Sequence, residues 1–497
     1  MPRKPIGESD VERIMSTVSD LVDEYHLPGI SVGVVSGQDL VFAEGFGFAD
    51  IESRRPQDPA LRQRIGSITK TMVGLCAMAL MDEGKLSLDD LVVEQLPDLT
   101  FHGPAGTLAV RHLLTHTGGI GEAPTMDDVT DPFAVLWSDT ADVPPVGSAY
   151  PDGILIETAP GTKWAYANHG FALLGEIVAR IEGKPIEGVL HNRVFGPLGM
   201  TDTDCLDLPH ERLTTGYQRP PGHDELDVLE LLGKDLPATY QAMPKDPKPV
   251  DGYNIRGRYV YVRPRAAGGV QSTIFDMARY AAALLRKGEG IVRSSTFDAM
   301  TAPQYRPDDR LMSVGLTFFR QRRFGSEGFG HGGGIAGGWN THLGVFPDEQ
   351  LAVLVHMNLS DGLFSRVAGR IVQAALDAPD TALPAHGLAP AVLESAPGVF
   401  QPAPGHLTNF RTVRATGRVQ ITAEGGELFL RSRRGAWREG VRMLPASDAD
   451  PGLFMLDTGD LEPPQVVLVR DEREEVTSIR FDRLVHLFRN DSLEPWV

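Results

Sequence analysis

Ser67 and Lys70 are the residues of this chain whose types and spacing point most directly to chemistry. They open a long apolar-periodic stretch that predicts a helix as far as Glu83, with Gly84 as its C-terminal cap. Residues three positions apart share a helix face, so the lysine ammonium can reach the serine hydroxyl. A serine becomes a nucleophile when a neighbouring base takes its proton, and a lysine whose pKa is lowered by burial or positive charge can be that base. The helix N-terminus also offers backbone N–H groups near Ser67 for an oxyanion.

The Ser67–Lys70 spacing alone is weak evidence for catalysis, and two further residues strengthen it. A Ser-x-x-Lys match arises about once by chance in a chain of this length and, by itself, favours a helix cap beside a solvated lysine. Tyr166 precedes a helix pattern over 171–181 and could present its phenol to a cleft, where a phenolate near a lysine passes protons between nucleophile and leaving group. Asn168 carries a donor and an acceptor for a substrate amide or for the lysine. The alternative interpretation is a surface loop with a stacked aromatic ring.

The third candidate element is His331 followed by Gly332, Gly333 and Gly334, just before a predicted strand at Asn340. Glycines let a substrate approach the backbone closely, and free N–H groups there suit an oxyanion hole. A glycine run can also cradle a phosphate. This one lacks the Gly-Lys-Ser/Thr ending of a P-loop and does not lead into a helix, which disfavours a nucleotide site.

The composition is that of a soluble globular protein of two or three domains, with 497 residues of which 42% are apolar and 23% charged. A formal net charge of −19 argues against nucleic acid or an anionic membrane as the main partner. The sequence contains no run of about 18 uninterrupted apolar residues, the length that spans a bilayer. The first residues lead into a polar pattern rather than the apolar core of a signal peptide. We therefore expect a cytoplasmic protein.

The elements that position the candidate residues are predicted from periodicity and turn signals. Helices are predicted at 9–26 and 363–376, and strands at 30–35, 40–44, 313–319, 340–346 and 352–356. Because strands occur near both ends of this region and helices between them, we expect an antiparallel sheet flanked by helices, with a helical insert. Two segments rich in Pro, Gly and Asp, 121–160 and 206–263, are predicted as long loops.

A second domain is predicted after a linker at 381–395, which is rich in Ala and Pro and poor in periodic pattern. Short strand-like runs separated by turn residues follow, and they predict a small β-barrel or sandwich over 396–497. The runs lie at 419–422, 427–431, 453–456, 465–469, 477–481 and 484–488.

Three groups of candidate residues follow one another along the chain: Ser67 with Lys70, Tyr166 with Asn168, and His331 with its glycines. Together, and in this order, they resemble the serine β-lactamase and penicillin-binding-protein superfamily. The most similar branch is the class C β-lactamase-related one, which contains esterases, D-aminopeptidases and D-amino-acid amidases. Further stretches look like signatures of that family, namely Arg64–Thr71, Gly84–Asp90, Arg111–Gly119, Pro160–Thr162, Pro197–Met200 and Ala267–Val270. The resemblance covers about residues 8–376, and 396–497 resembles the lipocalin-like β-domain of several members. It implies an α+β, β-lactamase/transpeptidase-like catalytic domain over 1–380 and a barrel-like domain after it.

The resemblance implies a role for each of the polar candidates. Ser67 would be acylated, Lys70 would assist its deprotonation, and Tyr166 would pass the proton to the leaving group. Asn168 would orient the substrate. No cofactor is implied.

The resemblance also implies roles for His331 and for the glycines that follow it. His331, Gly333 and Gly334 would line the substrate cleft at the edge strand, and the backbone N–H groups of Ser67 and Gly334 would form the oxyanion hole. His331 stands where many members have the lysine of a Lys-Thr-Gly motif. A histidine is neutral much of the time at pH 7, whereas a lysine there suits the carboxylate of a β-lactam or peptide. The substitution favours esters and D-amides over β-lactams.

These observations predict a serine hydrolase that acts through an acyl-enzyme on a small ester or on a D-amino-acid amide or peptide. An acyltransferase or peptide cyclase with the same site, a β-lactamase or DD-peptidase, and a non-catalytic binding relative are the alternatives. The expected partner is a small molecule or short peptide, and oligomeric state is not readable from the sequence.

No metal site is predicted. His112 and His116 have the i, i+4 spacing of a zinc-binding helix, but no Glu follows His112 and the segment matches a structural signature of the family. The two cysteines, Cys76 and Cys205, do not make a disulfide framework.

Overall fold

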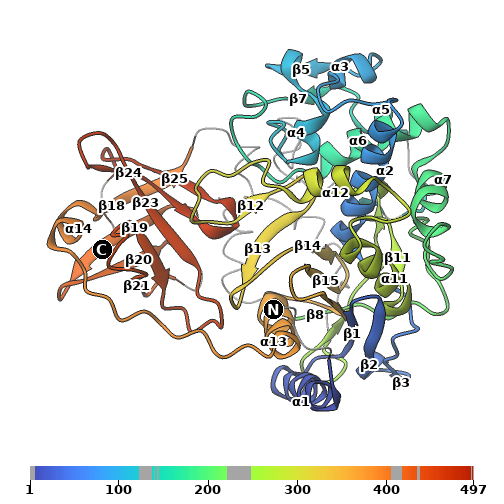
Figure 1. The fold of residues 1–497 in the computed structure, drawn as a ribbon, viewed down its shortest axis with the longest axis horizontal. Helices are drawn as coiled ribbons and strands as arrows, with labels where there is room; N and C mark the ends of the chain where they lie inside the picture. Colours follow the sequence, from blue (N-terminus) through green and yellow to red (C-terminus); the bar gives the residue numbers. More distant parts are fainter. Residues whose placement is uncertain are drawn as a thin grey trace.

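A large antiparallel sheet forms the centre of the first domain (Figure 1). The computed structural model describes residues 6–121, 137–138, 140–142, 145–220, 248–403, 417–433, 437–493 and 495. Within these residues the sheet has eight strands in the order β12-β13-β14-β15-β16-β1-β2-β3. Their bounds are β12 Ser313–Val314, β13 Phe319–Arg323, β14 Ser326–Ile335, β15 Trp339–Phe346, β16 Leu351–Met357, β1 Gly29–Ser36, β2 Asp39–Asp50 and β3 Arg55–Pro56. The sheet is therefore built from both ends of the domain, as predicted.

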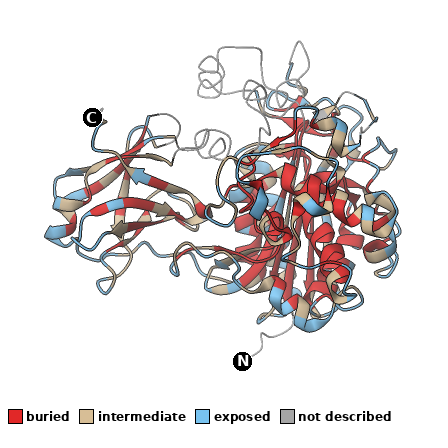
Figure 2. Cartoon of the chain, turned by 90° about the horizontal axis from the view of Figure 1, so that it is seen from above, coloured by how far each residue is buried: buried red, intermediate tan, exposed pale blue. Residues whose placement is uncertain are grey.

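Helices cover both faces of this sheet, so its central strands are buried along almost their whole length. All seven residues of β16 are buried, and so are seven of the eight in β1. One face carries α1 (Glu8–Tyr25) and α13 (Phe364–Leu376), which pack against each other and against β2 and β16. The other face carries α11 (Ile274–Leu285) and the helical region. Buried residues accordingly concentrate along the sheet and the helices beside it (Figure 2).

The helical region is organised around α2 (Thr69–Asp82), a helix whose residues 69–80 are all buried. A helix that is apolar on every side has to lie inside the protein. It is surrounded by α6 (Asn168–Glu182), α7 (Ile186–Leu190) and α10 (Arg265–Gly268). The remaining short elements are α3 Val92–Gln95, α4 Val110–Leu114, α5 Val146–Ala149, α12 Ser294–Thr301, a π-helical segment at His191–Phe195, and the strands β4 Gln63–Arg64, β5 Phe101–His102, β6 Trp137–Ser138, β7 Ile154–Leu155, β8 Tyr217–Gln218, β9 Ile255–Arg256, β10 Tyr261–Val262, β11 Gln271–Ser272 and β17 Leu359–Ser360.

The second domain is a closed antiparallel barrel with its own apolar core. Its strands are β18 Gly398–Pro402, β19 Val419–Glu424, β20 Glu427–Ser432, β21 Val441–Pro445, β22 Leu453–Leu456, β23 Gln465–Arg470, β24 Val476–Phe481 and β25 His486–Arg489. A short helix, α14 (Pro390–Ser395), precedes the first strand. The predicted barrel is thus present, and its likeness to lipocalins stays an expectation.

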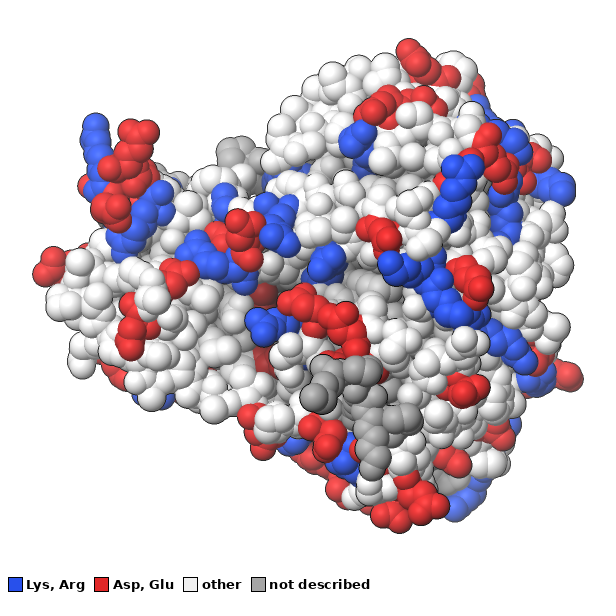
Figure 3. Space-filling view, viewed as in Figure 1, with Lys and Arg blue, Asp and Glu red and all other residues white. Residues whose placement is uncertain are grey.

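Ion pairs join the barrel to the first domain. Arg323 on β13 pairs with Glu462, which also accepts from the backbone N–H of Phe324. Arg310 pairs with Asp450 at 3.0 Å, and Arg366 pairs with Asp460 at 2.8 Å. Charges of both signs are mixed over the face seen in Figure 3, the junction included. The barrel is therefore held at the β13 side of the sheet by contacts that depend on charge.

One predicted strand is divided in the structure, and several observed strands have no predicted counterpart. The predicted strand 313–319 is divided, because Thr317 has a φ of +70°, outside the extended region, and residues 315–318 turn between β12 and β13. The segment 326–335 is a strand although it is rich in glycine, and no strand was predicted there. In the barrel, β18 and β21 were also missed, since both are five residues long and end at a proline. The predicted loops 121–160 and 206–263 lie partly outside the described residues, and their described parts include β7 to β10.

None of the helices within the described ranges is long and apolar enough to cross a membrane.

Candidate active site

Ser67 lies in a single 3₁₀ turn, Gly66–Ile68, that leads directly into α2. Gly66 has a φ of +54°, and a Cβ added there would lie 2.8 Å from the backbone nitrogen of Gly334. A Cβ on Gly333 would lie 2.0 Å from the carbonyl oxygen of Ile65. Glycines at 66 and 333 therefore let β14 lie directly against the turn that carries the serine. The N–H of Gly334 is thereby brought beside the start of α2.

Lys70 is fully buried, and its Nζ lies close to three oxygens. The distances are 2.9 Å to Ser67 Oγ, 2.7 Å to Asn168 Oδ1 and 2.6 Å to the backbone carbonyl oxygen of Ala267. The amide and carbonyl oxygens can only accept, so each takes an N–H of Lys70. The serine hydroxyl can donate or accept. A neutral amine held in this way would therefore direct its lone pair at Ser67 Oγ, which is the arrangement that a base for that hydroxyl needs.

Tyr166 lies over the same lysine, with Lys70 Nζ 5.0 Å from the centre of its ring. The ring is stacked against His116 at 4.3 Å and against Phe319 at 6.3 Å, and it lies 6.2 Å from His331. The phenol is consequently held among aromatic rings beside the Ser67–Lys70 pair. The structure brings Tyr166 beside Ser67 and Lys70, although the tyrosine lies almost a hundred residues further along the sequence.

Asn168 is the first residue of α6, and its side chain serves the lysine through Oδ1. The sequence left open whether this amide would hold a substrate or the lysine. In the structure Oδ1 faces Lys70, so any donation to a substrate has to come from Nδ2.

His331 lies within β14 and is buried, with 5% of its surface exposed. Its Nδ1 lies 2.6 Å from the carbonyl oxygen of Gly332, and because a carbonyl only accepts, Nδ1 carries the proton. Burial, followed by the positive charge of Lys70, lowers the pKa of His331 to about 3. The ring is therefore neutral at physiological pH, which is the state that the sequence argument required for a preference for esters and amides.

The edge of β14 is open where the candidate oxyanion hole is expected. The pairing of β13 with β14 ends at Phe319 and Gly330, so residues 331–335 have no β13 strand beside them. Gly332 and Gly334 are exposed on this edge. The position of Gly334 beside Gly66 is compatible with the oxyanion hole that the family resemblance implies, and that role stays a prediction.

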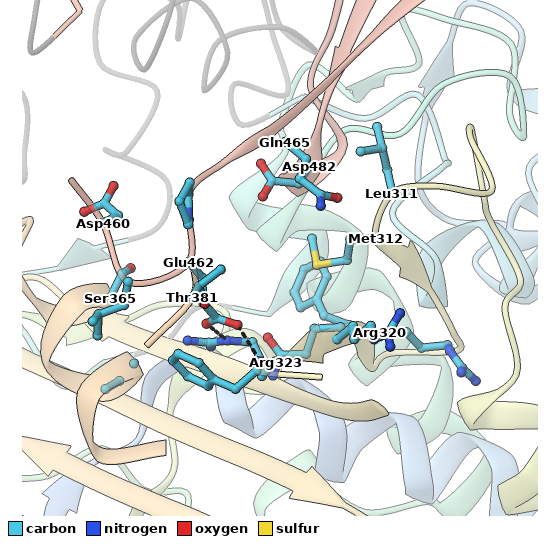
Figure 4. Close-up of a pocket in the computed structure, with 18 of the residues that line it drawn as sticks. Leu311, Met312, Arg320, Arg323, Ser365, Thr381, Asp460, Glu462, Gln465 and Asp482 are labelled. Carbon is cyan, nitrogen blue, oxygen red and sulfur yellow. Dashed lines mark hydrogen bonds and ion pairs between the residues drawn. The ribbon is translucent and has the colours of Figure 1, made fainter. Parts of the chain in front are cut away.

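A cavity of about 1370 Å³ adjoins this edge and reaches the barrel. On the side of the site it is lined by Trp164, Phe319, His331 and Gly332, and on the side of the barrel by Leu453, Met455 and Gln465. Figure 4 shows Asp482 and Gln465 of the barrel opposite Met312 and Arg320, with the Arg323–Glu462 pair at another part of the wall. The cavity borders the candidate site at His331 and Gly332, and Ser67, Lys70 and Tyr166 are not among the residues that line it. It is far larger than a small ester would fill.

Sequence reasoning missed several groups of this site. The carbonyl of Ala267 was quoted only as part of a family signature, although it holds the lysine. Phe319 and Trp164 were not singled out, and His116 was considered only for its metal-like spacing. Among the described residues, no group of three or more His, Cys, Asp or Glu side chains lies close enough to hold a metal ion.

The comparisons with known proteins agree with this architecture. The family model described as Beta-lactamase matches residues 14–378, more than half of the sequence, so the chain belongs to the β-lactamase family. Protein flp of Staphylococcus aureus (strain COL) is 27% identical over 234 residues, which are 46% of this chain and 45% of that protein. An uncharacterized protein of Mycobacterium tuberculosis is 30% identical over 209 residues, 38% of this chain and 50% of that protein. The chain spans about half the length of the curated relatives it matches.

Two solved structures share the fold at low sequence identity. The octameric penicillin-binding protein homologue from Pyrococcus abyssi has a TM-score of 0.59 and 21% identity, and the match covers 97% of this chain and 100% of that one. The D-amino acid amidase from Ochrobactrum anthropi SV3, complexed with D-phenylalanine, has a TM-score of 0.60 and 22% identity over 74% of this chain and 99% of that one. The first match is long enough to include the barrel. The chain is thus a β-lactamase-family protein with a C-terminal closed barrel, which supports a serine hydrolase of that superfamily.

Proposed function

We propose that this protein hydrolyses a small ester, or a D-amino-acid amide or peptide, through an acyl-enzyme on Ser67. The observation that carries the proposal is the placement of Lys70 Nζ 2.9 Å from Ser67 Oγ, with Asn168 Oδ1 and the Ala267 carbonyl holding its N–H groups. That arrangement fits a base aimed at a nucleophile.

In this mechanism Ser67 Oγ attacks the carbonyl carbon of the substrate while its proton passes to Lys70 Nζ. The carbonyl oxygen becomes an oxyanion, which the N–H groups of Ser67 and Gly334 stabilise. The bond to the leaving group then breaks, and Tyr166 supplies the proton that an amine or alkoxide leaving group requires. The proton held by Lys70 then passes to Tyr166 and restores its phenol. Water attacks the acyl carbon, one of its protons passes through Lys70 or Tyr166 to Ser67 Oγ as the bond between the acyl group and Oγ breaks, and the carboxylic acid leaves.

The preference for neutral esters and D-amides rests on His331. Its pKa is lowered to about 3 by burial and then by Lys70, so it adds no positive charge to the cleft at neutral pH. A β-lactam or DD-peptide carboxylate would find no cation at this position. The similarity in fold to a D-amino acid amidase is in line with the amide branch of the proposal.

Labelling with a fluorophosphonate probe, followed by peptide mass mapping, tests the nucleophile. We expect modification of Ser67, and loss of both labelling and p-nitrophenyl ester hydrolysis in Ser67→Ala. Ser365→Ala is the matched control, because Ser365 is a serine on the wall of the adjoining cavity and should leave both unchanged. Absence of labelling in the unaltered protein, together with full activity of Ser67→Ala, would sink the proposal and favour a non-catalytic binding relative.

The size of the cavity supports a second candidate, acyl transfer to an amine, which includes peptide cyclisation. A space of about 1370 Å³ between the site and the barrel could hold an acceptor as well as the acyl chain. We would measure the ratio of transfer product to acid while raising the concentration of a D-amino-acid amide acceptor. Saturable growth of the transfer product supports transfer, and acid alone supports hydrolysis. Nitrocefin turnover would test the β-lactamase alternative in parallel.

A further inference from the structure

His116 makes the closest ring contact of Tyr166 found in the described parts of the chain. The two ring centres lie 4.3 Å apart with an angle of 29° between their planes, which is a stacked arrangement. Only 3% of the surface of His116 is exposed. Phe171 and Trp164 lie 5.2 Å and 6.2 Å from its ring, so the imidazole is enclosed by aromatic side chains and has little room to rotate.

His116 also holds the backbone on each side of Tyr166. The N–H of Ala165 donates to the carbonyl oxygen of His116 at 2.8 Å, and the N–H of Ala167 donates to its Nδ1 at 3.1 Å. The residues before and after the tyrosine are thus bonded to one and the same residue. A single side chain and its own backbone therefore set both the path of this segment and the plane of the phenol ring.

The backbone conformation at position 116 limits which residue types could stack on Tyr166 and accept the hydrogen bond from Ala167. Its φ of +56° is in the left-handed region, where histidine, asparagine and aspartate are tolerated better than most residues other than glycine. Position 116 also needs a flat ring for the stack and an acceptor atom for Ala167. Phenylalanine has the ring without the acceptor, and asparagine has an acceptor without the ring. Histidine combines all three properties.

The hydrogen bond from Ala167 further fixes the form of the imidazole. Because Nδ1 accepts an N–H, it carries no proton, and the uncharged ring keeps its proton on Nε2. An uncharged ring can stack on Tyr166 without adding a second cation beside Lys70.

We propose that His116 is a positioning residue for Tyr166, which fixes the phenol where it can protonate an amine leaving group. This inference rests on the proposed function and adds to it a residue that touches neither substrate nor Ser67. It also gives a structural role to one residue of the pair His112 and His116, whose i, i+4 spacing resembles that of a zinc-binding helix. His112 makes the same kind of bond, since its Nδ1 accepts from Ala109 N–H at 3.0 Å, and no aromatic contact joins its ring to Tyr166 among the described contacts.

The test compares leaving groups, because p-nitrophenolate departs without a proton and an amine does not. In His116→Phe we expect kcat for an amide substrate to fall about tenfold or more, with KM within about twofold and p-nitrophenyl ester turnover little changed. His116→Asn, which keeps an acceptor and tolerates the left-handed backbone, should recover part of the amide rate. His112→Asn is the matched control and should leave the amide-to-ester ratio unchanged.

Equal loss of ester and amide turnover in both His116 variants would overturn the inference, because that result describes a general structural defect. Crystal structures of the unaltered protein and of both variants provide a readout that needs no turnover. We expect the Tyr166 ring to leave its present place in His116→Phe, and an unmoved ring would equally overturn the inference. If Ser67 is not labelled while Tyr166 does move, the proposed hydrolase fails and the positioning contact stands.

Discussion

At the scale of single residues, the site is a cluster of side chains in hydrogen-bond and ring contact with one another, centred on Lys70 and Tyr166. Burial lowers the pKa of His331, and the positive charge of Lys70 lowers it further, so the histidine on β14 does not titrate near neutrality. The proton that matters for the proposed chemistry therefore moves between Ser67, Lys70 and Tyr166.

This arrangement makes a prediction about pH dependence. Because the pKa of His331 is about 3, the ring stays uncharged above roughly pH 4, and the profile of kcat/KM between pH 5 and 8 should contain no inflection due to it. His331→Gln should give a pH profile of the same shape, even where kcat/KM itself is changed by the substitution. An inflection near pH 6.5 that is present in the unaltered enzyme and absent from the variant would contradict this expectation.

At the scale of elements, the site depends on the close approach of β14 to the turn that carries Ser67. Thr341 on β15 adds to this contact, because its Oγ1 donates to the Ile65 carbonyl at 2.9 Å. A side chain at position 66 or 333 would hold β14 away from the turn that carries Ser67.

Alanine at two neighbouring glycines tests this packing. A Cβ on Gly333 would lie 2.0 Å from Ile65 O and 2.3 Å from Thr341 Oγ1, whereas the nearest atom to a Cβ on Gly332 is 3.8 Å away. Gly333→Ala should lower the free energy of unfolding by about 2 kcal/mol or more, the usual cost of overpacking. Gly332→Ala, the matched control, should change it by less than about 0.5 kcal/mol, as exposed positions do. Denaturant unfolding of both variants measures the difference, and equal stability would refute the close approach.

A buried histidine on β16 predicts loss of stability in acid. His356 is 2% exposed, and burial lowers its pKa from 6.5 to about 3. Between these values the unfolded chain binds a proton that the folded chain does not, so stability falls as the pH drops below 6.5. The loss from this residue is about 2 kcal/mol between pH 7 and pH 5, at ~1.4 kcal/mol per unit. His356→Leu should lose less stability over that range than the unaltered protein, with His191→Leu, at an exposed histidine, as control. Parallel curves for all three would count against the linkage.

At the scale of the whole molecule, ion pairs between separate segments join the barrel to the first domain beside the edge of its sheet. Arg323 and Glu462 lie at the wall of the shared cavity, as Figure 4 shows. Access to the open edge of β14 is therefore set by where the barrel docks.

Charge reversal tests this docking. Arg323→Glu should place two carboxylates against each other and loosen the barrel, seen as a larger radius of gyration in solution scattering and faster proteolysis between the domains. Arg323→Glu combined with Glu462→Arg should restore the compact state, because the pair is re-formed with the opposite polarity. Arg322→Glu is the control, since Arg322 is 71% exposed and its carboxylate partner Glu327 is 3.9 Å away. No difference between the Arg323 and Arg322 variants would show that this pair does not hold the barrel.

The sequence by itself determined the features that depend on residues close together along the chain. The Ser67–Lys70 pair follows from helical spacing, and most helices and strands follow from apolar periodicity, which is a local property. The family resemblance then implied roles for the candidate residues, Tyr166 among them, and identified the fold family. The β-rich pattern after the linker was sufficient to predict a small β-barrel or sandwich, though not β18 or β21, and the structure shows a closed barrel.

Only the tertiary structure decided which distant groups complete the site. The Ala267 carbonyl, the ring of His116 and the glycine strand β14 act through contacts between residues up to 270 positions apart, which no local pattern encodes. A glycine run has low strand propensity, and here it lies in a strand because β15 pairs with its backbone, while β13 pairs only with the residues before it. The cavity beside His331 likewise exists only because the barrel docks at that edge. The candidate nucleophile was thus readable from the sequence once Tyr166, Asn168 and the glycine run after His331 accompanied its spacing, whereas its environment required the packed fold.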